Sequence, residues 1–323
     1  MKNESVVWGI IGCGDVAEIK SGPAFQKCEN SKLFAVMRRD ANLAQDFAKR
    51  HQVPLWYSKA EDLLNNKDIN AVYIATPPFT HLNYTLQALK AGKDVYLEKP
   101  MVLSLDEANI LTDAVSKSKN KLVVAHYRRF LPMYLKVKSL LDANTLGRIN
   151  YVDIRFLQPD NFNSKSTWRL NASVSGGGYF HDIGPHQLDL MYYFFGSFNT
   201  VKGMSINQTK RHDVDDMVNG LISFDNDVQF RGIWSFDINK DLQEDNCTIY
   251  GENGIMKFSF YEDRLEVISK NLNTTFEFEN PENIQLPMIQ ETVNYFLGKR
   301  DNPCSVEAGR EVSLILDAFT VKK

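Results

Sequence analysis

Short runs of apolar residues recur through the first 126 residues and alternate with longer polar stretches of helical character. Two of these stretches, ANLAQDFAKRH and LNYTLQALKAG, place apolar side chains three and four positions apart, as one face of a helix requires. The apolar runs are typical of strands buried in a parallel sheet, and they lie at residues 6–11, 33–37, 71–75, 94–97 and 122–125. This alternation predicts an α/β Rossmann domain with a doubly wound parallel sheet.

A different pattern follows in the rest of the chain. Residues 148–157 alternate between apolar and polar side chains, and residues 228–236 form another strand-like run behind the turn sequence DND. The sequence ENG at 252–254 separates two further apolar runs and predicts a β-hairpin. We therefore expect an α+β C-terminal domain with an open mixed or antiparallel sheet. The two domains would cover residues 1–126 and 127–323.

The composition narrows the class of protein. A chain of 323 residues exceeds what one hydrophobic core usually spans, which agrees with two domains. Lys and Arg total 37 against 40 for Asp and Glu, so neither nucleic acid nor an anionic membrane would be attracted electrostatically. The N-terminal apolar run is too short and too rich in glycine for a signal peptide or a membrane span. We expect a cytoplasmic protein whose partner is a small molecule.

The cysteines indicate neither a disulfide framework nor a zinc site. They are scattered along the chain and form no CxxC pair. They are Cys13, Cys28, Cys247 and Cys304. No metal is therefore expected.

The first apolar run leads directly into the sequence GCGDVA, a GxGxxA form of the dinucleotide-binding fingerprint. Gly12 permits a tight turn, Gly14 lets the backbone approach a pyrophosphate closely, and Ala17 is small enough for a helix to pack on the strand. The motif follows an expected strand and opens an expected helix, which is the context that it requires. The cofactor-binding residues assigned to this loop are Gly12, Cys13, Gly14, Asp15 and Val16.

The residues after the second strand indicate which dinucleotide binds. An NAD enzyme commonly has an acidic side chain here for the ribose 2'-hydroxyl, whereas this chain has Arg38 and Arg39, which suit a 2'-phosphate. Asp40 is better interpreted as the N-cap of the following helix. We therefore predict NADP(H), with NAD(H) as the second choice. The alternative is that both arginines belong to a solvated loop.

Further cofactor candidates follow later strands of the first domain. In a doubly wound sheet, ligands bind at the carboxyl ends of the strands. Pro100 biases Lys99 toward an extended backbone and permits a cis peptide bond, so the ammonium group would have a defined direction. A lysine after a strand is otherwise an ordinary solvated residue. The candidates at this edge are Thr76, Pro77, His81, Glu98 and Lys99, and Thr80 is expected to cap the helix that follows.

The stretch SGGGYFHDIGPHQLD at residues 175–189 carries the main catalytic signal. Its three glycines allow crowded or left-handed backbone close to a ligand. Asp182 and His186 have the spacing that stacks two side chains on one helical face. An imidazole with a reference pKa of ~6.5 suits proton transfer near neutrality, and a neighbouring carboxylate can fix its tautomer. The alternative is a glycine loop capped by Asp182, with His186 as an ordinary core residue.

Together these motifs closely resemble the Gfo/Idh/MocA oxidoreductases, a family named after glucose-fructose oxidoreductase and inositol dehydrogenase. The resemblance rests on GIIGCGDVA, IATPPFTHLNYTLQALKAGKDVYLEKPM, YRRFLP and WRLNASVSGGGYFHDIGPHQLD, and it extends to the closing helices around PMIQETVNYFLG and AGREVSLILDAF. It implies that substrate and nicotinamide meet between a Rossmann domain and a second domain that binds substrate. It also implies that Lys99, Asp182 and His186 form the catalytic set.

The expected substrate-binding residues come from the second domain and from YRRFLP, which we place at the mouth of the first domain. The resemblance puts Trp168 and Arg169 near the substrate, although a packed tryptophan beside a surface arginine is an equally good interpretation. The full set is Tyr127, Arg128, Trp168, Arg169, Asp182 and His186.

The activity expected from these residues is reversible hydride transfer between NADP(H) and a secondary alcohol or ketone of a sugar, keto-sugar or cyclitol. His186 would remove the hydroxyl proton, Asp182 would orient the imidazole, and Lys99 would stabilise the alkoxide and reach the cofactor ribose. Lys99 as the acid or base is the second choice for the proton carrier, and His181 is the third.

Two other activities stay open for this fold. One is a redox-neutral glycosidase that oxidises a sugar transiently and keeps its cofactor bound. The other is a non-catalytic regulator, which would have no reason to keep the Lys99, Asp182 and His186 set. The motifs do not identify the sugar, the carbon oxidised, the direction or whether the substrate is phosphorylated. Apolar alternation at 228–236 and 246–260 predicts a homo-oligomer, dimer or tetramer, that covers the open sheet.

Overall fold

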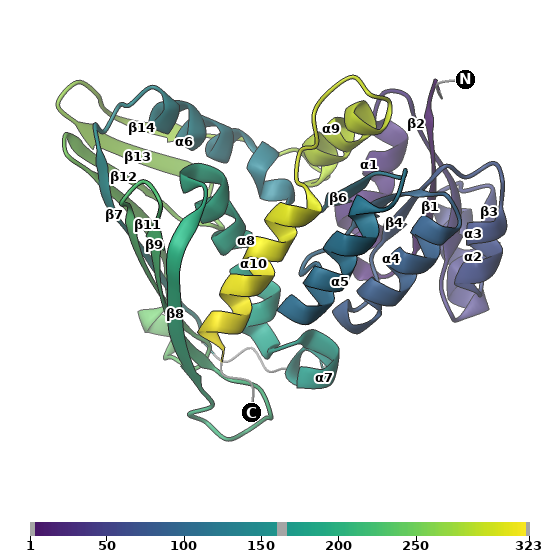
Figure 1. Ribbon diagram of the computed structural model, residues 1–323, viewed down its shortest axis with the longest axis horizontal. Coiled ribbons are helices and arrows are strands. Elements are labelled where there is room, and N and C mark those ends of the chain that lie inside the picture. The colour runs from purple at the N-terminus through teal and green to yellow at the C-terminus, as the bar shows by residue number, and fades with distance from the viewer. Residues whose placement is uncertain (1–3, 160–166, 321–323) are drawn as a thin grey trace. The chain divides into compact units, whose positions relative to one another are not determined.

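Two sheets organise the protein in the computed structural model, which describes residues 4–159 and 167–320 (Figure 1). The chain divides into two units, each built on one sheet. The first unit consists of Met1–Arg128 with Pro281–Arg310, and the second of Arg129–Asn280 with Glu311–Lys323. The units are therefore not consecutive in sequence. A single boundary at residue 126 does not describe this arrangement, because residues 281–310 return to the first unit.

The first unit has the predicted doubly wound parallel sheet. Its strand order is β3-β2-β1-β4-β5-β6, with every pairing parallel. The strands are β1 (Val6–Ile11), β2 (Ser31–Met37), β3 (Leu55–Tyr57), β4 (Ala71–Ile74), β5 (Asp94–Leu97) and β6 (Leu122–Val124). Buried aliphatic and aromatic side chains fill β1, β4 and β5, as expected for strands covered on both faces. The chain order reverses between β1 and β4, which is where such sheets bind ligands.

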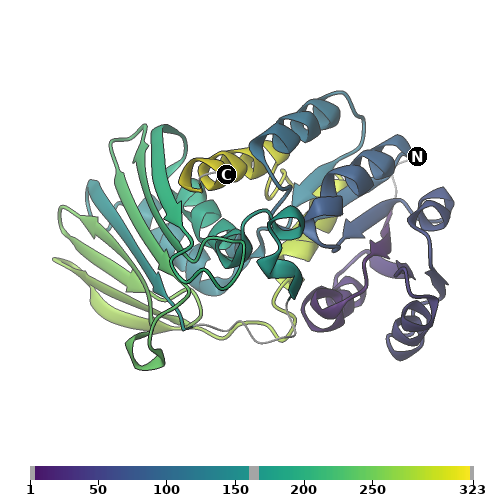
Figure 2. The same cartoon turned by 90° about the horizontal axis from the view of Figure 1, so that it is seen from below.

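Helices cover both faces of this sheet (Figures 1 and 2). They are α1 (Gly22–Lys27), α2 (Ala41–Arg50), α3 (Ala60–Asn65), α4 (His81–Lys90), α5 (Leu105–Ser116) and α9 (Leu286–Phe296). Asp40 caps α2 as predicted, since its Oδ1 accepts from the backbone nitrogens of Asn42 and Leu43. Thr80 does not cap α4. Its hydroxyl oxygen lies 2.7 Å from Thr76 Oγ1 and 2.9 Å from the carbonyl of Pro77 instead. The Thr80 backbone nitrogen donates to the same carbonyl and closes a 3-10 turn ahead of the helix.

Specific polar contacts bring the segment before α9 back to the first unit. Lys27 Nζ donates to Asn283 Oδ1 at 2.7 Å, and Asn283 Nδ2 donates to the carbonyl of Ile19 at 2.9 Å. Gln285 is 1% exposed and bonds to groups on β5. Residues late in the chain therefore complete the core of the first unit, which a hydrophobic pattern alone does not reveal.

The second unit has the predicted open, mixed sheet. Its order is β14-β13-β12-β11-β7-β10-β9-β8, and β10 with β7 is its parallel pair. The strands are β7 (Ile149–Leu157), β8 (Phe198–Ile206), β9 (Met217–Phe224), β10 (Gln229–Ser235), β11 (Glu244–Gly251), β12 (Gly254–Phe258), β13 (Arg264–Ser269) and β14 (Asn273–Glu277). Gly251 pairs with Gly254, which confirms the hairpin predicted from ENG.

Helices pack on one face of this second sheet (Figure 1). They are α6 (Pro132–Asp142), α8 (Gly178–Phe195) and the last part of α10 (Val306–Phe319), within which the unit boundary falls. The short helix α7 (Ala172–Ser175) precedes α8 and contacts it. Phe180 on α8 lies 4.9 Å from Trp234 and 6.4 Å from Phe319, measured between ring centroids. This aromatic cluster fixes α8 on the sheet. No described helix has the length and hydropathy that a bilayer-crossing segment needs.

Candidate functional site

The GCGDVA loop has the backbone geometry that its sequence predicts. Gly12 has φ +96°, and a Cβ there would lie 2.8 Å from Thr76 Cγ2. A Cβ at Gly14 would meet no atom within 4 Å, so open space lies beside this part of the backbone. Burial raises the pKa of the Cys13 thiol to about 11 and makes its side chain a neutral packing group. The loop therefore offers backbone rather than side chains to a ligand.

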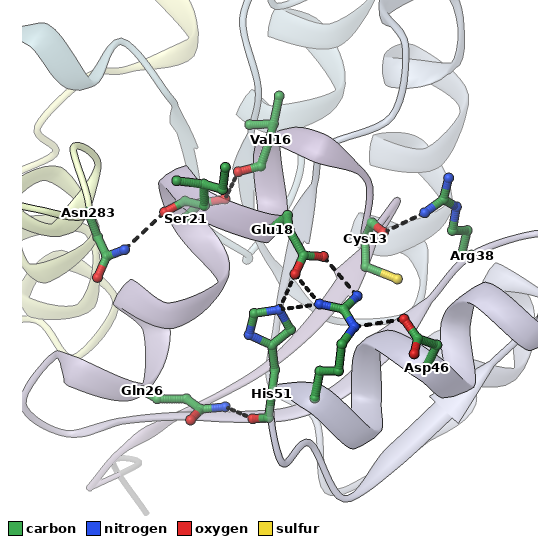
Figure 3. A network of polar contacts seen from close by, with 11 residues as sticks. Cys13, Val16, Glu18, Ser21, Gln26, Arg38, Asp46, His51 and Asn283 are labelled. Carbon is green, nitrogen blue, oxygen red and sulfur yellow. Dashed lines mark hydrogen bonds and ion pairs between the residues drawn. The ribbon is translucent and has the colours of Figure 1, made fainter.

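Arg38 and Arg39 differ in their surroundings. Arg38 is half-buried at the end of β2, and its Nη1 donates to the carbonyl of Cys13 at 3.4 Å (Figure 3). Arg39 is exposed. Arg38 is thus held against the glycine loop. Arg39 is exposed to solvent, as the alternative of a solvated loop predicted for both arginines.

A second charged group lies on the helices next to this loop and was not anticipated. Glu18 Oε2 accepts from Arg50 Nη2 at 3.0 Å, and His51 Nε2 lies 2.8 Å from Glu18 Oε1 (Figure 3). Arg50 Nε also donates to Asp46 Oδ2 at 2.7 Å. The hydrogen bond from Arg50 lowers the pKa of Glu18. These contacts tie the turn after GCGDVA to the end of α2.

His81 contacts two loops at the carboxyl edge of the first sheet. Its side chain is fully buried, with Nε2 2.7 Å from the carbonyl of Thr76 and Nδ1 2.9 Å from the carbonyl of Pro100. Thr76 and Pro77 are half-buried on one of these loops. The Lys99-Pro100 peptide bond on the other loop is cis, as Pro100 permits. Both ring nitrogens of His81 therefore face backbone carbonyls and hold the two loops together.

Glu98 is a buried carboxylate that fixes the backbone of Lys99. Its Oε1 accepts from Tyr73 Oη at 2.5 Å and from Gln285 Nε2 at 2.6 Å, and its Oε2 accepts from the Lys99 backbone nitrogen at 3.1 Å. Tyr96 Oη completes the cluster by donating to Gln285 Oε1 at 3.1 Å. Burial, followed by the charge of Glu98, raises the pKa of Tyr73 well above its ordinary value. Sequence reasoning found Glu98 and Lys99 but missed Gln285.

The YRRF segment contributes to both units. Tyr127 and Arg128 are buried in the first unit, with the Arg128 guanidinium 5.9 Å from the centre of the Tyr127 ring. Arg129 belongs to the second unit, where its Nε and Nη2 donate to the two carboxylate oxygens of Asp189 at 2.8 and 2.7 Å. This buried bidentate pair anchors α8.

The glycine run starts α8 and does not place Asp182 at its N-cap. Gly178 has φ +77°, and a Cβ there would lie 2.6 Å from Val214 Cγ2, so close packing requires glycine at this position. Because α8 begins at Gly178, Asp182 lies inside the helix. Asp182 and His186 therefore share one helical face, and the alternative of a capping aspartate does not hold.

Asp182 is paired with the residue that the sequence places near the substrate. Arg169 Nε donates to Asp182 Oδ2 at 2.7 Å, and the Arg169 guanidinium lies 4.5 Å from the centre of the Trp168 ring. His186 is buried, whereas Asp182 is partly exposed. His181 is also buried, with Nε2 3.2 Å from Thr320 Oγ1, so it points away from this pair. Trp168, Arg169 and Asp182 thus form one group in the second unit, and His186 lies one turn further along α8.

A cavity of about 450 Å³ lies in the second unit and is lined in part by α8. Tyr179 and Ile183 of α8 line it, together with residues at the ends of β7, β10 and β11. Tyr179, Asp182, Ile183 and His186 follow the i, i+3, i+4, i+7 spacing of one helical stripe. Tyr179 and Ile183 line the cavity, whereas Asp182 and His186 on the same stripe are not among its lining residues. No described cluster of His, Cys, Asp and Glu side chains could hold a metal ion.

Comparison with known proteins identifies related chains. Residues 6–126 match the oxidoreductase family with an NAD-binding Rossmann fold, and residues 134–257 match the GFO/IDH/MocA C-terminal domain. The chain is 52% identical over 318 residues to Oxidoreductase P35 of Formosa agariphila, covering 97% of each chain.

Solved structures share the fold at low sequence identity. A levoglucosan dehydrogenase in complex with NADH and L-sorbose has a TM-score of 0.89 at 21% identity, over 98% of this chain and 96% of that one. A 3-ketoreductase from Actinomadura kijaniata in complex with NADP has a TM-score of 0.84 at 21% identity, over 98% and 97%. The two family-model matches and the 52% identity with Oxidoreductase P35 show that the chain belongs to the Gfo/Idh/MocA family of oxidoreductases.

Proposed function

We propose that the protein transfers a hydride between NADP(H) and a secondary alcohol or ketone of a sugar or cyclitol. The observation that carries the proposal is the position of Asp182 and His186 one turn apart on α8, with Arg169 donating to the Asp182 carboxylate. The family assignment makes the reaction a redox one, and the nicotinamide, when bound, supplies or accepts the hydride.

The residues of the first unit fit a bound dinucleotide. Gly14 has open space beside it, so a pyrophosphate could approach the backbone nitrogens of the loop. Arg38 lies against the same loop, and its guanidinium would bind a 2'-phosphate on the adenosine ribose. Arg38 is the reason for proposing NADP(H) over NAD(H), because relatives of this fold have been solved with either cofactor.

His186 is the proposed proton carrier. It would take the proton of the substrate hydroxyl in the oxidative direction and return it in reduction. Asp182, on the preceding turn of α8, would stabilise the charged imidazole, and Arg169 holds the Asp182 carboxylate in place.

Lys99 is proposed to stabilise the negative charge that develops on the substrate oxygen. The contact of its backbone nitrogen with Glu98 fixes the start of its side chain. An ammonium with a reference pKa of ~10.4 serves better as an electrostatic partner than as a base. Lys99 as acid or base remains the second choice.

A screen of the purified protein tests the reaction class. Absorbance of the reduced nicotinamide would be followed with NADP(H) and with NAD(H), against sugars, keto-sugars and cyclitols. A substrate-dependent change in absorbance supports the proposal. Cleavage of a glycoside without net cofactor change would instead show the redox-neutral glycosidase, and no response with any cofactor or substrate would favour the regulator.

A homo-oligomer, dimer or tetramer, is proposed from the second sheet. Apolar side chains are exposed on the face opposite the helices, and they are Met204, Ile206, Leu221, Tyr250 and Ile268. A second copy of the chain would cover them. A cytoplasmic location also stays a prediction.

A further inference from the structure

The turn that follows the glycine loop has an uncommon helical geometry. It is η1 (Ala17–Ser21), a π-helical turn that the backbone nitrogen of Gly22 closes by donating to the carbonyl of Ala17. A Cβ at Gly22 would lie 2.3 Å from that carbonyl oxygen, so the turn requires glycine there. Single π-helical turns occur frequently at functional sites. The backbone nitrogen of Glu18 donates to the carbonyl of Gly14 at 3.0 Å, which joins η1 to the loop.

Residues 283–285, which we call the bridging segment, supply donors to η1. Asn283 Nδ2 donates to the carbonyl of Ile19 at 2.9 Å (Figure 3). The backbone nitrogen of Gln285 donates to the carbonyl of Lys20 at 3.4 Å. Asn283 is buried, so a shift of η1 away from it would leave an amide donor without a partner and away from water. The bridging segment therefore follows the position of η1.

The other end of the bridging segment holds the loop that carries Lys99. Gln285 Nε2 donates to Glu98 Oε1 at 2.6 Å, and Glu98 Oε2 accepts from the Lys99 backbone nitrogen at 3.1 Å. Gln285 is 1% exposed and Glu98 is 6% exposed, and hydrogen bonds between buried groups are costly to break. A continuous path of hydrogen bonds thus runs from the glycine loop to the backbone of Lys99, all within the first unit.

We propose that Asn283 and Gln285 are positioning residues that couple these two loops. A nucleotide bound to the glycine loop holds η1, η1 holds the bridging segment, and the bridging segment holds the backbone of Lys99. The inference rests on the proposed function, because it takes Lys99 as the group that meets the substrate oxygen. Its consequence is that the backbone of Lys99 is best ordered when the cofactor is bound.

A second route between the same loops runs through His81. Its ring nitrogens lie 2.7 Å from the carbonyl of Thr76 and 2.9 Å from that of Pro100. A nucleotide that touched Thr76 could order the neighbouring loop by this route. The bridging segment differs because it begins at η1 and ends on the Lys99 amide itself, so variants of Asn283 distinguish the two routes.

Hydrogen exchange of single backbone amides in the full-length protein tests the coupling without turnover. The probes are ADP and adenosine 2',5'-bisphosphate at saturation, because neither has the nicotinamide half that Lys99 would contact directly. In the wild type, the nucleotide that binds should slow exchange of both the Glu18 and the Lys99 amides by at least about fivefold. The Lys121 amide, bonded to Asp94 Oδ1 at the opposite end of β5, is the reference and should change little.

Three results in the wild type would overturn the coupling. Slowing at Glu18 alone would show that the nucleotide does not act on Lys99. Equal slowing at Glu18, Lys99 and Lys121 would assign the effect to general stabilisation by a ligand. If neither nucleotide slows exchange at Glu18, the loop is not a nucleotide site and the coupling falls with it.

Asn283→Asp interrupts the path at η1. It keeps the volume of the side chain but removes the donor to Ile19, so it should fold normally. With nucleotide bound, the variant is expected to keep the slowing at Glu18 and lose that at Lys99. Slowing at Lys99 that survives in Asn283→Asp would assign the effect to His81 and overturn the role of the bridging segment.

Gln285→Leu interrupts the path at its other end and should likewise lose the slowing at Lys99. Retention of that slowing would contradict the proposal independently of Asn283. Gln290→Leu is the matched control on the same late segment, because Gln290 bonds to the backbone of Glu29. It should respond to nucleotide as the wild type does.

The two proposals fail in different ways. If nucleotide orders Lys99 through Asn283 but no substrate changes nicotinamide absorbance, the coupling stands and the hydride-transfer proposal fails. If hydride transfer is observed but nucleotide slows exchange at Glu18 alone, the hydride-transfer proposal stands and the coupling fails.

Discussion

Gln285 Nε2 donates to Glu98 Oε1 at 2.6 Å across 187 residues of sequence. Both side chains are buried, and the same carboxylate also holds the backbone nitrogen of Lys99. A residue late in the chain thereby supports the loop that presents the proposed catalytic lysine. This contact explains physically why residues 281–310 belong to the first unit.

Replacing Gln285 should therefore destabilise the first unit. Gln285→Leu keeps the approximate volume but removes a donor to a buried carboxylate, and such hydrogen bonds contribute roughly 1.5–3 kcal/mol. We expect a loss of this size in the free energy of unfolding, measured by urea titration. Gln290→Leu is the matched control, since Gln290 makes an exposed bond to Glu29. Equal losses of unfolding free energy in the two variants would show that the buried hydrogen bond of Gln285 stabilises the protein no more than the exposed one of Gln290.

The contact between Glu18 and Arg50 predicts a pH-dependent contribution to stability. The hydrogen bond from Arg50 lowers the pKa of Glu18 from its ordinary value of 4.5 in the folded state. A lowered folded-state pKa adds stability above the unfolded pKa, and this stability is lost as pH falls through the folded pKa. Glu18→Gln should therefore lower Tm at pH 7, and this effect should become smaller as the pH falls below 4.5.

The control for this pH experiment is Glu61→Gln on α3, where the side chain is exposed. Its effect on Tm should be small at both pH values. A Glu18→Gln effect that is as large at pH 3 as at pH 7 would assign the loss to packing rather than to charge.

Local patterns predicted the fold because its elements depend on nearby residues. The apolar run 6–11 became β1 with the same bounds, and the ENG turn became the β11–β12 hairpin. The division into units was not predictable in this way. The return of Gln285 to the first unit depends on contacts far apart in sequence, and its only local sign is a glutamine before a helix.

The candidate site was partly predictable for the same reason. Asp182 and His186 are four residues apart, so any helix that contains both places them on one face. Because α8 contains both, the structure has this shared face. Arg169 donating to Asp182 depends on the packing of a loop against that helix, which spacing does not show. The lining of the cavity likewise combines residues of β7, β11 and α8 with residues that follow β10 and β12.

The proposed catalytic residues should affect turnover far more than cofactor binding. Lys99→Ala and His186→Ala are each expected to lower kcat by at least ~100-fold, since a positioned acid or base typically contributes this much. Asp182→Asn should cost less, because the amide can still accept from Arg169. The affinity for the cofactor, measured by fluorescence titration, should stay near wild type. Retention of most activity in His186→Ala would remove His186 as the proton carrier, and Lys117→Ala at an exposed position serves as the control.

The exposed face of the second sheet should mediate self-association. Leu221 is 55% exposed on the face opposite the helices, and Leu221→Asp would place a charge in the proposed interface. Light scattering at micromolar concentration is expected to give an oligomer for wild type and a smaller species for Leu221→Asp. Leu135→Asp on α6 should leave the oligomer intact. A monomer mass for the wild type would refute the interface.

Arg38 should determine the choice of cofactor. Its guanidinium lies against the glycine loop through a 3.4 Å contact with the Cys13 carbonyl, whereas Arg39 is exposed. A 2'-phosphate carries nearly two negative charges, and charge-assisted hydrogen bonds to it are worth roughly 1.5–3 kcal/mol, or about ten- to hundredfold in affinity. We expect kcat/KM to favour NADP(H) over NAD(H) by at least this order.

Arg38→Asp should reverse the preference, because the carboxylate repels the phosphate and can accept from a ribose 2'-hydroxyl. Arg39→Asp is the matched control and should change the ratio much less. Equal kcat/KM for both cofactors in the wild type, or the same shift from both substitutions, would show that Arg38 does not recognise the phosphate.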